Sequence, residues 1–222
     1  MFDPMKKILF IISGLGLGNS TRSDAVIQQL VKKGYSVDVL TSDNGIVYFK
    51  TRNYVRNIYE SKSLYYGNSN GRLSVWRTLF AVPNYLRILW VNARHVQALL
   101  KKENYAAIVI DTDYTLFFLK NKIKIPIVAL NNSDVVIKKS KNSSYIPSEI
   151  KLQLFIEQFD YYFHQKIPDL VLSPVICSNT GQEGKFIHLS PFIREELAPR
   201  KANHKITRIL VMLSGSQFGS CT

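Results

Sequence analysis

The chain has 222 residues, of which 46% are hydrophobic and 20% are charged; this excludes a disordered chain and is typical of a globular protein. Its 29 Lys and Arg residues outnumber its 16 Asp and Glu residues, which gives a formal net charge of +13. Two Cys and four scattered His residues favour neither a disulfide scaffold nor a metal site. No stretch reaches the roughly 18 apolar residues that span a bilayer. We therefore expect a cytoplasmic protein without a metal.

The start of the chain predicts a βαβ unit. Residues 7–13 are a short apolar run, typical of a strand that is buried on both faces. Residues 22–33 have apolar positions at helical spacing, and Gly34 directly after them suits a helix C-terminus. Residues 36–41 then form a second apolar run, which we interpret as the second strand.

The alternation of strands and helices continues along the chain. We predict further helices at about 84–102, 114–120 and 148–165, a polar loop at 138–144, and further strands at 106–111, 125–130, 170–173 and 185–189. Strands that alternate with helices indicate a parallel sheet wrapped on both faces. The predicted fold is therefore an α/β, Rossmann-like parallel sheet with helices on both faces.

The last residues depart from this pattern. A polar stretch at 195–205 precedes an apolar run at 208–213, and only nine residues follow Leu213, whereas a βαβ crossover needs a dozen or more. We predict a first domain at 1–194, a linker at 195–205, and at 206–222 the first strand and turn of a truncated second domain. The alternative is that 208–213 is the last strand of the same sheet.

The loop after the first strand carries three alternating glycines, Gly14, Gly16 and Gly18. Glycines let the backbone approach a ligand closely, and the N–H groups at the start of the next helix can bind an anion. As a dinucleotide-binding fingerprint the loop is incomplete, because Asn19 stands where the third glycine is due. The acid that such a site needs for the ribose would be Asp38 or Asp43.

This loop and four later motifs resemble the N-terminal half of GT-B glycosyltransferases. The likeness is greatest to families 1 and 28 and to the lipid-linked N-acetylglucosaminyltransferase of peptidoglycan synthesis. In members with this look the loop reads roughly Gly-x-Gly-x-Gly-His-x-x-Arg-Ser, which Gly14, Gly16, Gly18, Arg22 and Ser23 match. The later motifs are the acid pair at 110–114, an Asn-containing turn at 128–133, a proline turn at 186–194 and the glycine strand at 208–215. Asn19 replaces the family's histidine and cannot take a proton at neutral pH.

The resemblance implies transfer of a sugar from a nucleotide-sugar donor, UDP-linked, to a hydroxyl acceptor such as a lipid-linked or cell-envelope glycan. It implies no metal or other cofactor, and it implies that the isolated half is inactive. Asp113 would be the catalytic base. The acceptor side would consist of Gly14, Gly16, Gly18, Asn19, Ser20, Arg22 and Asn132, and the donor side would begin with Ser214, Gly215 and Ser216. A separate donor-domain chain is a possible partner.

Some of these residues also have structural interpretations. Asp113 suits the N-cap of the helix after it, and Asp111 a structural hydrogen bond at a strand end. Arg22 stands in a first helical turn, where positive charge opposes the helix dipole, so we interpret it mainly as an anchor for the loop. We interpret His188, in an apolar strand, as a satisfied core histidine.

The segment at 76–102 combines a basic stripe, repeated every seven residues at Arg87, Arg94 and Lys101, with aromatic residues. It suits a solvated helix packed on the sheet, which Pro83 would begin, or contact with an anionic membrane from its cytoplasmic face. No nucleic-acid-binding motif accompanies the positive charge, so we expect no nucleic acid partner. Three rival functions stay open: an NAD(P)-dependent oxidoreductase, a sugar-nucleotide epimerase, and a non-catalytic module that binds a glycan or an anionic surface.

Overall fold

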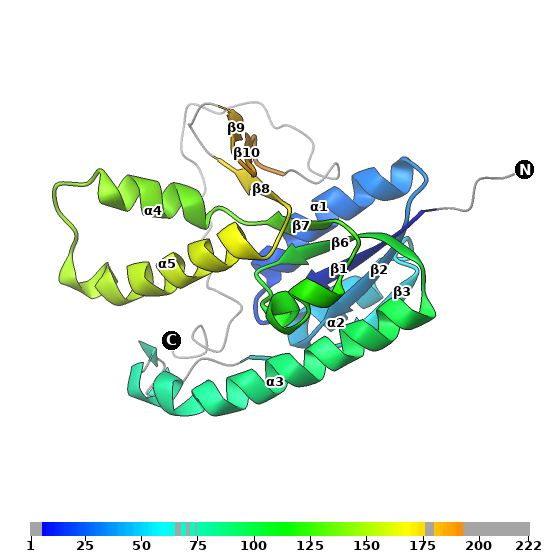
Figure 1. The fold of residues 1–222 in the computed structure, drawn as a ribbon, viewed down its shortest axis with the longest axis horizontal. Coiled ribbons are helices and arrows are strands. Elements are labelled where there is room, and N and C mark those ends of the chain that lie inside the picture. The colour runs from blue at the N-terminus through cyan, green and yellow to red at the C-terminus, as the bar shows by residue number, and fades with distance from the viewer. Residues whose placement is uncertain (1–5, 65–67, 70–71, 74, 176–179, 193–222) are drawn as a thin grey trace, which may run out of the picture.

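The computed structural model describes residues 6–64, 68–69, 72–73, 75–175 and 180–192. In this part of the chain, eight strands form one sheet in the order β3-β2-β1-β6-β7-β8-β10-β9 (Figure 1). The strands of this sheet are β1 (Lys7–Ile12), β2 (Ser36–Thr41), β3 (Asn57–Glu60), β6 (Tyr105–Asp111), β7 (Ile127–Leu130), β8 (Leu170–Pro174), β9 (Gly181–Glu183) and β10 (Phe186–Leu189). All neighbours pair in parallel except β10 and β9, which are antiparallel. Two short strands, β4 (Asn68–Ser69) and β5 (Arg72–Leu73), form a separate antiparallel pair.

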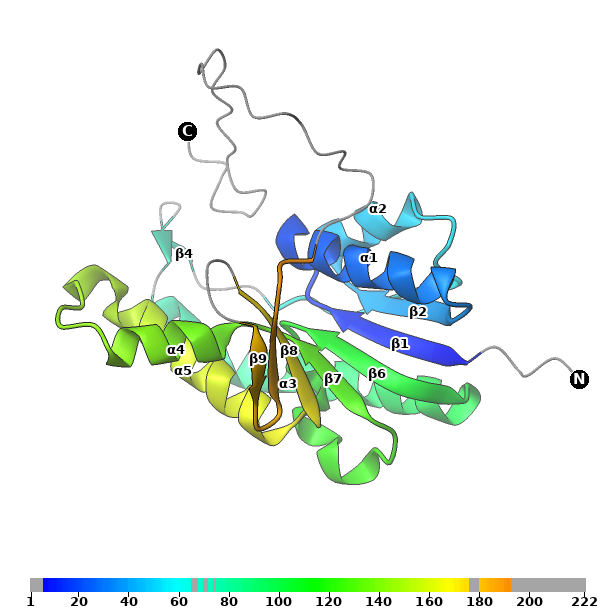
Figure 2. The same ribbon diagram turned by 90° about the horizontal axis from the view of Figure 1, so that it is seen from above.

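Helices cover both faces of the sheet (Figures 1 and 2). One face carries α1 (Leu17–Lys32) and α2 (Asp43–Lys50), and the other carries α3 (Val75–Lys102) and α5 (Lys151–Lys166). Between β7 and α5 lie α4 (Ser133–Lys141) and the 3-10 turn η3 (Ser148–Ile150). The predicted Rossmann-like α/β fold is therefore confirmed.

Alternate residues of β1 show why this strand is apolar throughout. Phe10 packs into the core beneath α1 and α2, and Leu9 and Ile11 pack into the core beneath α3 and α5. Each of these side chains is at most 1% exposed. A strand with helices on both sides has no solvent face, so a continuous apolar run is what such a position requires.

The helix predicted at 114–120 is wrong in type. The chain there forms two 3-10 turns, η1 (Thr115–Phe118) and η2 (Lys120–Lys122). Leu116 and Leu119 are both buried, and a spacing of three residues places them on one side of a 3-10 turn. The short connection between β6 and β7 is therefore tighter than an α-helix.

Other differences concern helix boundaries and elements without a clear pattern. Helix α3 begins at Val75, so Pro83 lies inside it and does not start it. The predicted loop at 138–144 is largely the end of α4. The lysines in its last turn interact favourably with the negative end of the helix dipole. Three short elements, α2, β3 and β9, were not predicted from the sequence, because they depend on packing against the sheet.

The predicted linker at 195–205 and the strand at 206–222 lie outside the described residues, and so do Ser214, Gly215 and Ser216. The division into two domains stays a prediction.

Candidate functional site

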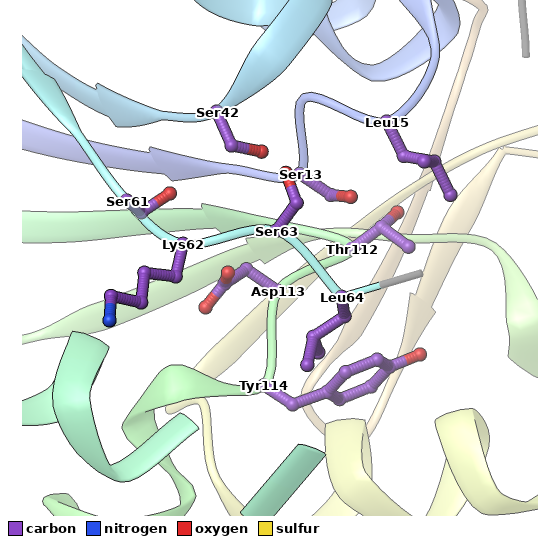
Figure 3. A pocket seen from close by; sticks show the side chains of 10 residues that line it. All are labelled: Ser13, Leu15, Ser42, Ser61, Lys62, Ser63, Leu64, Thr112, Asp113 and Tyr114. Atoms are coloured by element: carbon purple, nitrogen blue, oxygen red, sulfur yellow. The ribbon is translucent and has the colours of Figure 1, made fainter. Parts of the chain in front are cut away.

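A polar cavity lies at the carboxyl edge of the sheet, where the strand order reverses between β1 and β6. Open α/β sheets bind ligands at such switch points, because the loops of the two neighbouring strands turn to opposite faces there. The inner cavity, as we call it, has a volume of about 50 Å³. The residues that line it stand directly after the ends of β1, β2, β3 and β6. They are Ser13, Leu15, Ser42 and residues 61–64 and 112–114 (Figure 3).

Asp113 supplies a carboxylate to the inner cavity. Its Oδ1 accepts a hydrogen bond of 2.7 Å from the Thr115 backbone N–H, the first of η1. The N-cap position of η1 is Tyr114, so Asp113 lies one residue before the position that we predicted for it. Burial raises the pKa of the Asp113 carboxyl, although the hydrogen bonds from Thr115 oppose the shift. A carboxylate with a raised pKa is a stronger proton acceptor than an ordinary aspartate.

Asp111 and Arg22 fix the backbone from which Asp113 projects. The fully buried Asp111 carboxylate accepts two hydrogen bonds from the Arg22 guanidinium, one of them from Nε at 3.0 Å, and one of 2.8 Å from Ser23 Oγ. Burial opposes the charge of Arg22, but the Asp111 carboxylate raises the pKa of the guanidinium. Arg22 thus anchors the loop, and Asp111 makes the structural hydrogen bonds that we expected.

Thr112, between the two aspartates, has a φ of +51°. This left-handed conformation is strained for a β-branched residue and costs about 1–2 kcal/mol. The Thr112 hydroxyl lies 3.3 Å from the Arg22 guanidinium and 3.4 Å from Asn19 Oδ1, and these contacts hold the residue in place. Strained backbone of this kind concentrates at functional sites.

The three glycines of the first loop lie in different surroundings. Gly14 is buried, and a Cβ atom there would lie 1.7 Å from the Ser42 carbonyl oxygen, so its missing side chain is required for packing. Cβ atoms at Gly16 and Gly18 would meet nothing within 4 Å. The packing of the chain therefore explains Gly14 and leaves the other two glycines next to open space.

The remaining predicted acceptor residues are placed less uniformly. Asn19 accepts a hydrogen bond of 3.3 Å from Arg22 through its Oδ1 atom and belongs to the same network. Ser20 is fully buried, where a bound acceptor would not touch it, because α1 turns this position toward the core. Asn132 is exposed at the N-terminus of α4. His188 is partly buried, and its Nε2 lies 2.7 Å from Asp134 Oδ2, which satisfies the ring nitrogen.

The segment at 61–64, which the sequence pattern did not indicate, lines the inner cavity together with residues 112–114 (Figure 3). The buried Asn92 on α3 holds this segment: its Oδ1 accepts from the Lys62 N–H at 2.9 Å, and its Nδ2 donates to the Lys62 carbonyl at 2.8 Å. The available signal was the run of Ser61, Lys62 and Ser63 directly after β3, a strand that was itself not predicted.

A buried acid on α5 supports the same edge of the sheet. Asp160 accepts hydrogen bonds of 2.7 Å from Tyr114 and from Asn131. Burial alone would raise the pKa of the Asp160 carboxyl. His164 and these two hydrogen bonds lower it by more, so the pKa is below its ordinary value. Asp160 therefore holds both Tyr114, which lines the inner cavity, and Asn131, which follows β7.

Of the two acids that the alternative dinucleotide site could use, Asp43 is exposed at the start of α2, whereas Asp38 is engaged inside the protein. Asp38 is 1% exposed, and it accepts hydrogen bonds from Arg56, from Tyr105 at 2.6 Å and from Asn57 at 3.1 Å. These partners leave no room for a ribose hydroxyl. Among the described residues, no group of three or more His, Cys, Asp and Glu is arranged to hold a metal ion, and none of the helices could cross a bilayer.

Helix α3 presents a mixed outer surface. Arg87, Arg94 and Lys101 are exposed, as the sequence predicted, and the Arg94 guanidinium stacks 4.9 Å from the centre of the Trp90 ring. Leu86 and Trp90 are 50% and 47% exposed. The side chains of residues 76–79 lie outside the described part.

Comparison with known proteins identifies the family of this chain. The sequence model of Glycosyl transferase family 1 matches residues 6–170, and the chain belongs to this family. No curated protein matches the sequence.

Solved glycosyltransferases have the same fold. UGT2 of Phytolacca americana, complexed with UDP-2-fluoro-glucose and pterostilbene, has a TM-score of 0.58 and 11% identity over 88% of this chain and 56% of that one. LpCGTa in complex with UDP has a TM-score of 0.55 and 10% identity over 85% and 53%. The glycosyltransferase of kitacinnamycin has a TM-score of 0.53 and 13% identity over 91% and 54%. The chain thus spans about half the length of these structures.

Proposed function

We propose that this protein acts in sugar transfer by holding an acceptor hydroxyl beside Asp113 at the carboxyl edge of the sheet. The observation that carries the proposal is the Asp113 carboxylate, which lines the inner cavity at the switch point of a glycosyltransferase-family fold. Its raised pKa supports a role as general base.

The reaction would be a direct displacement at the sugar. The acceptor oxygen attacks the anomeric carbon of the nucleotide sugar, the bond from that carbon to the diphosphate breaks, and the diphosphate leaves with the bonding electrons. Asp113 takes the acceptor proton. Asn19 cannot fill this role, because its amide takes up no proton at neutral pH and its Oδ1 already accepts from Arg22.

The donor and the finer relationship are parts of the same proposal. We expect a UDP-linked donor, whose site would begin with Ser214, Gly215 and Ser216 after the linker at 195–205. The motif of the first loop supports a relation to family 28 and to the peptidoglycan enzyme, and hence a lipid-linked or cell-envelope acceptor. Backbone N–H groups at helix ends can stabilise a departing diphosphate without a metal.

Substitution of Asp113 tests the proposal. Asp113→Asn keeps an oxygen that can accept from Thr115, so we expect a transfer rate at least about 100-fold lower in a full-length protein supplied with labelled UDP-sugars and hydroxyl acceptors. The matched control is Asp169→Asn, because Asp169 also accepts a backbone N–H bond, 2.8 Å from Ile127, but precedes β8 at the opposite edge. Full activity of Asp113→Asn would exclude the carboxylate as base, and no transfer by the wild type to any acceptor would contradict the function.

Asp113→Asn should also change how the stability of the protein depends on pH. Because the pKa of Asp113 is raised by burial, the protonated carboxyl is the form that folding favours. The protonated Asp113 carboxyl contributes fully to stability at a pH below its pKa in the unfolded chain. This contribution is lost as the pH rises through its pKa in the folded protein. Asp113→Asn lacks this loss, so it should melt at an equal or higher temperature than the wild type at neutral pH. Wild-type activity should fall as acid protonates Asp113.

We also propose that the protein approaches an anionic membrane surface from the cytoplasmic side. The exposed Leu86 and Trp90, with Arg87 and Arg94 beside them on α3, support this contact. Apolar side chains flanked by basic ones suit the headgroup region of such a membrane.

A further inference from the structure

A second, larger cavity adjoins the inner cavity. This outer cavity has a volume of about 680 Å³, and its lining consists of Asp43, Glu60, Asn84, Ile88 and residues 61–63. Residues 61–63 line both cavities, so this segment forms the boundary that the two share. A ligand that occupies the outer cavity is therefore adjacent to the cavity that contains Asp113.

The shared segment is held by the core of the protein. The buried Asn92 side chain bonds both the N–H and the carbonyl of Lys62, and the Ser61 N–H donates to the Thr41 carbonyl at 2.8 Å. Two different elements, α3 and β2, thus fix the position of the segment. Such pre-organisation reduces the conformational entropy that binding would otherwise cost.

The lining of the outer cavity is chemically unlike that of a pocket for an apolar ligand. It offers the carboxylates of Asp43 and Glu60, the ammonium of Lys62, two serine hydroxyls and the amide of Asn84, with Ile88 as the one apolar side chain among the described lining residues. Small-molecule pockets are lined mostly by hydrophobic and aromatic side chains with a few polar groups. Here six of the seven lining residues are polar or charged.

From this lining we infer that the outer cavity is a subsite for the non-reacting part of the acceptor, and that this part is a neutral, hydroxyl-rich saccharide. The inference rests on the proposed function and adds the acceptor's class and its position. Sugar hydroxyls donate to carboxylates and accept from ammonium and amide groups, so each polar lining group has a partner on such a ligand. Two carboxylates against one ammonium disfavour an anionic ligand.

Binding to the full-length, ¹⁵N-labelled protein tests the inference without a need for turnover. The probes are cellobiose and di-N-acetylchitobiose as saccharides, and pterostilbene as an apolar hydroxyl compound. We expect the saccharides to shift the amide signals of Asp43, Asn84, Ile88 and residues 61–63, and pterostilbene to leave them unchanged. The subsite would be overturned if pterostilbene alone shifted these signals, or if none of the three probes shifted them at 10 mM. A dissociation constant of 10 mM corresponds to about 2.7 kcal/mol of binding free energy.

Two variants locate the binding. Asn84→Ala removes a lining amide and should weaken saccharide binding about five- to tenfold, the loss of roughly one hydrogen bond. Arg87→Ala, an exposed position on the same helix outside the lining, should bind like the wild type. Equal effects of the two substitutions would contradict the assignment. Saccharide binding without sugar transfer would support the subsite and contradict the proposed function. Asp113-dependent sugar transfer without saccharide binding in the outer cavity would support the proposed function and contradict the subsite.

Discussion

At the scale of single residues, this site depends on a few side chains that support one another. Asp111 is buried and neutralised by Arg22, which leaves Asp113, two residues later, as the carboxylate that lines the cavity. Thr112 between them is strained and is held by the same network. The first acid of the motif thus has a structural role, and the second is the one that the proposed chemistry uses.

The glycines of the first loop give a residue-scale prediction. Gly14→Ala should destabilise the protein by about 3 kcal/mol, because its Cβ would overlap the Ser42 carbonyl. Gly18→Ala meets no neighbour and lies in the first turn of α1, so it should raise stability by about 0.5 kcal/mol. Urea unfolding measures both effects. If the open space beside Gly18 receives substrate, Gly18→Ala should also weaken sugar transfer at least about tenfold, and unchanged transfer would remove Gly18 from the site.

At the scale of elements, α3 contains the largest departure from the predicted boundaries. Pro83 is an ordinary first-turn residue in the sequence pattern, but the helix continues before it to Val75. Proline inside a helix lacks the N–H for the bond to residue 79 and crowds that carbonyl. The helix therefore carries a weak point eight residues after its start.

Replacement of this proline is the corresponding test. Pro83→Ala should stabilise the first turns of α3 by up to about 3 kcal/mol. Hydrogen exchange of the amides at residues 80–87 measures this change, and Arg87→Ala, an exposed substitution in the same stretch, serves as the control. Unchanged protection in Pro83→Ala would show that the proline does not limit this part of the helix.

At the scale of the whole molecule, the two faces of the sheet differ in their outer surfaces. The face with α3, η1 and α5 exposes large apolar side chains, which are 47–70% exposed: Leu86, Trp90, Phe117, Phe155, Phe159 and Tyr162. The opposite face exposes fewer, namely Leu17 at the start of α1 and Val47 on α2. If the first face meets a membrane, the protein has a fixed orientation on it.

Binding to anionic vesicles tests this orientation. The double variant Leu86→Ser/Trp90→Ser should bind phosphatidylglycerol vesicles about tenfold more weakly than the wild type, a loss of about 1.4 kcal/mol that is modest beside full burial of two such side chains. Val47→Ser, an exposed apolar residue on the other face, should bind normally. High salt should weaken wild-type binding, because it screens Arg87 and Arg94. Equal binding of all three proteins would contradict the contact.

The sequence by itself determined the α/β class and most strands of the sheet. Buried parallel strands must be apolar on both faces, so residues 7–13 and 36–41 carry an unambiguous signal. It also singled out Asp113, because a carboxylate directly after a buried strand lies at the edge where such sheets bind ligands. Short elements such as α2 and β3 carry no comparable signal, because they are stable only where the sheet supports them.

Only the tertiary structure decided which polar residues share the site. Asn92 and Lys62 are 30 residues apart and have no common motif, yet their hydrogen bonds fix the boundary between the two cavities. Ser20 and Gly14 look like ligand residues in the loop, but burial assigns them to the core. The reason is physical: periodicity reports which face of an element is apolar, whereas contacts between distant elements depend on how those faces pack.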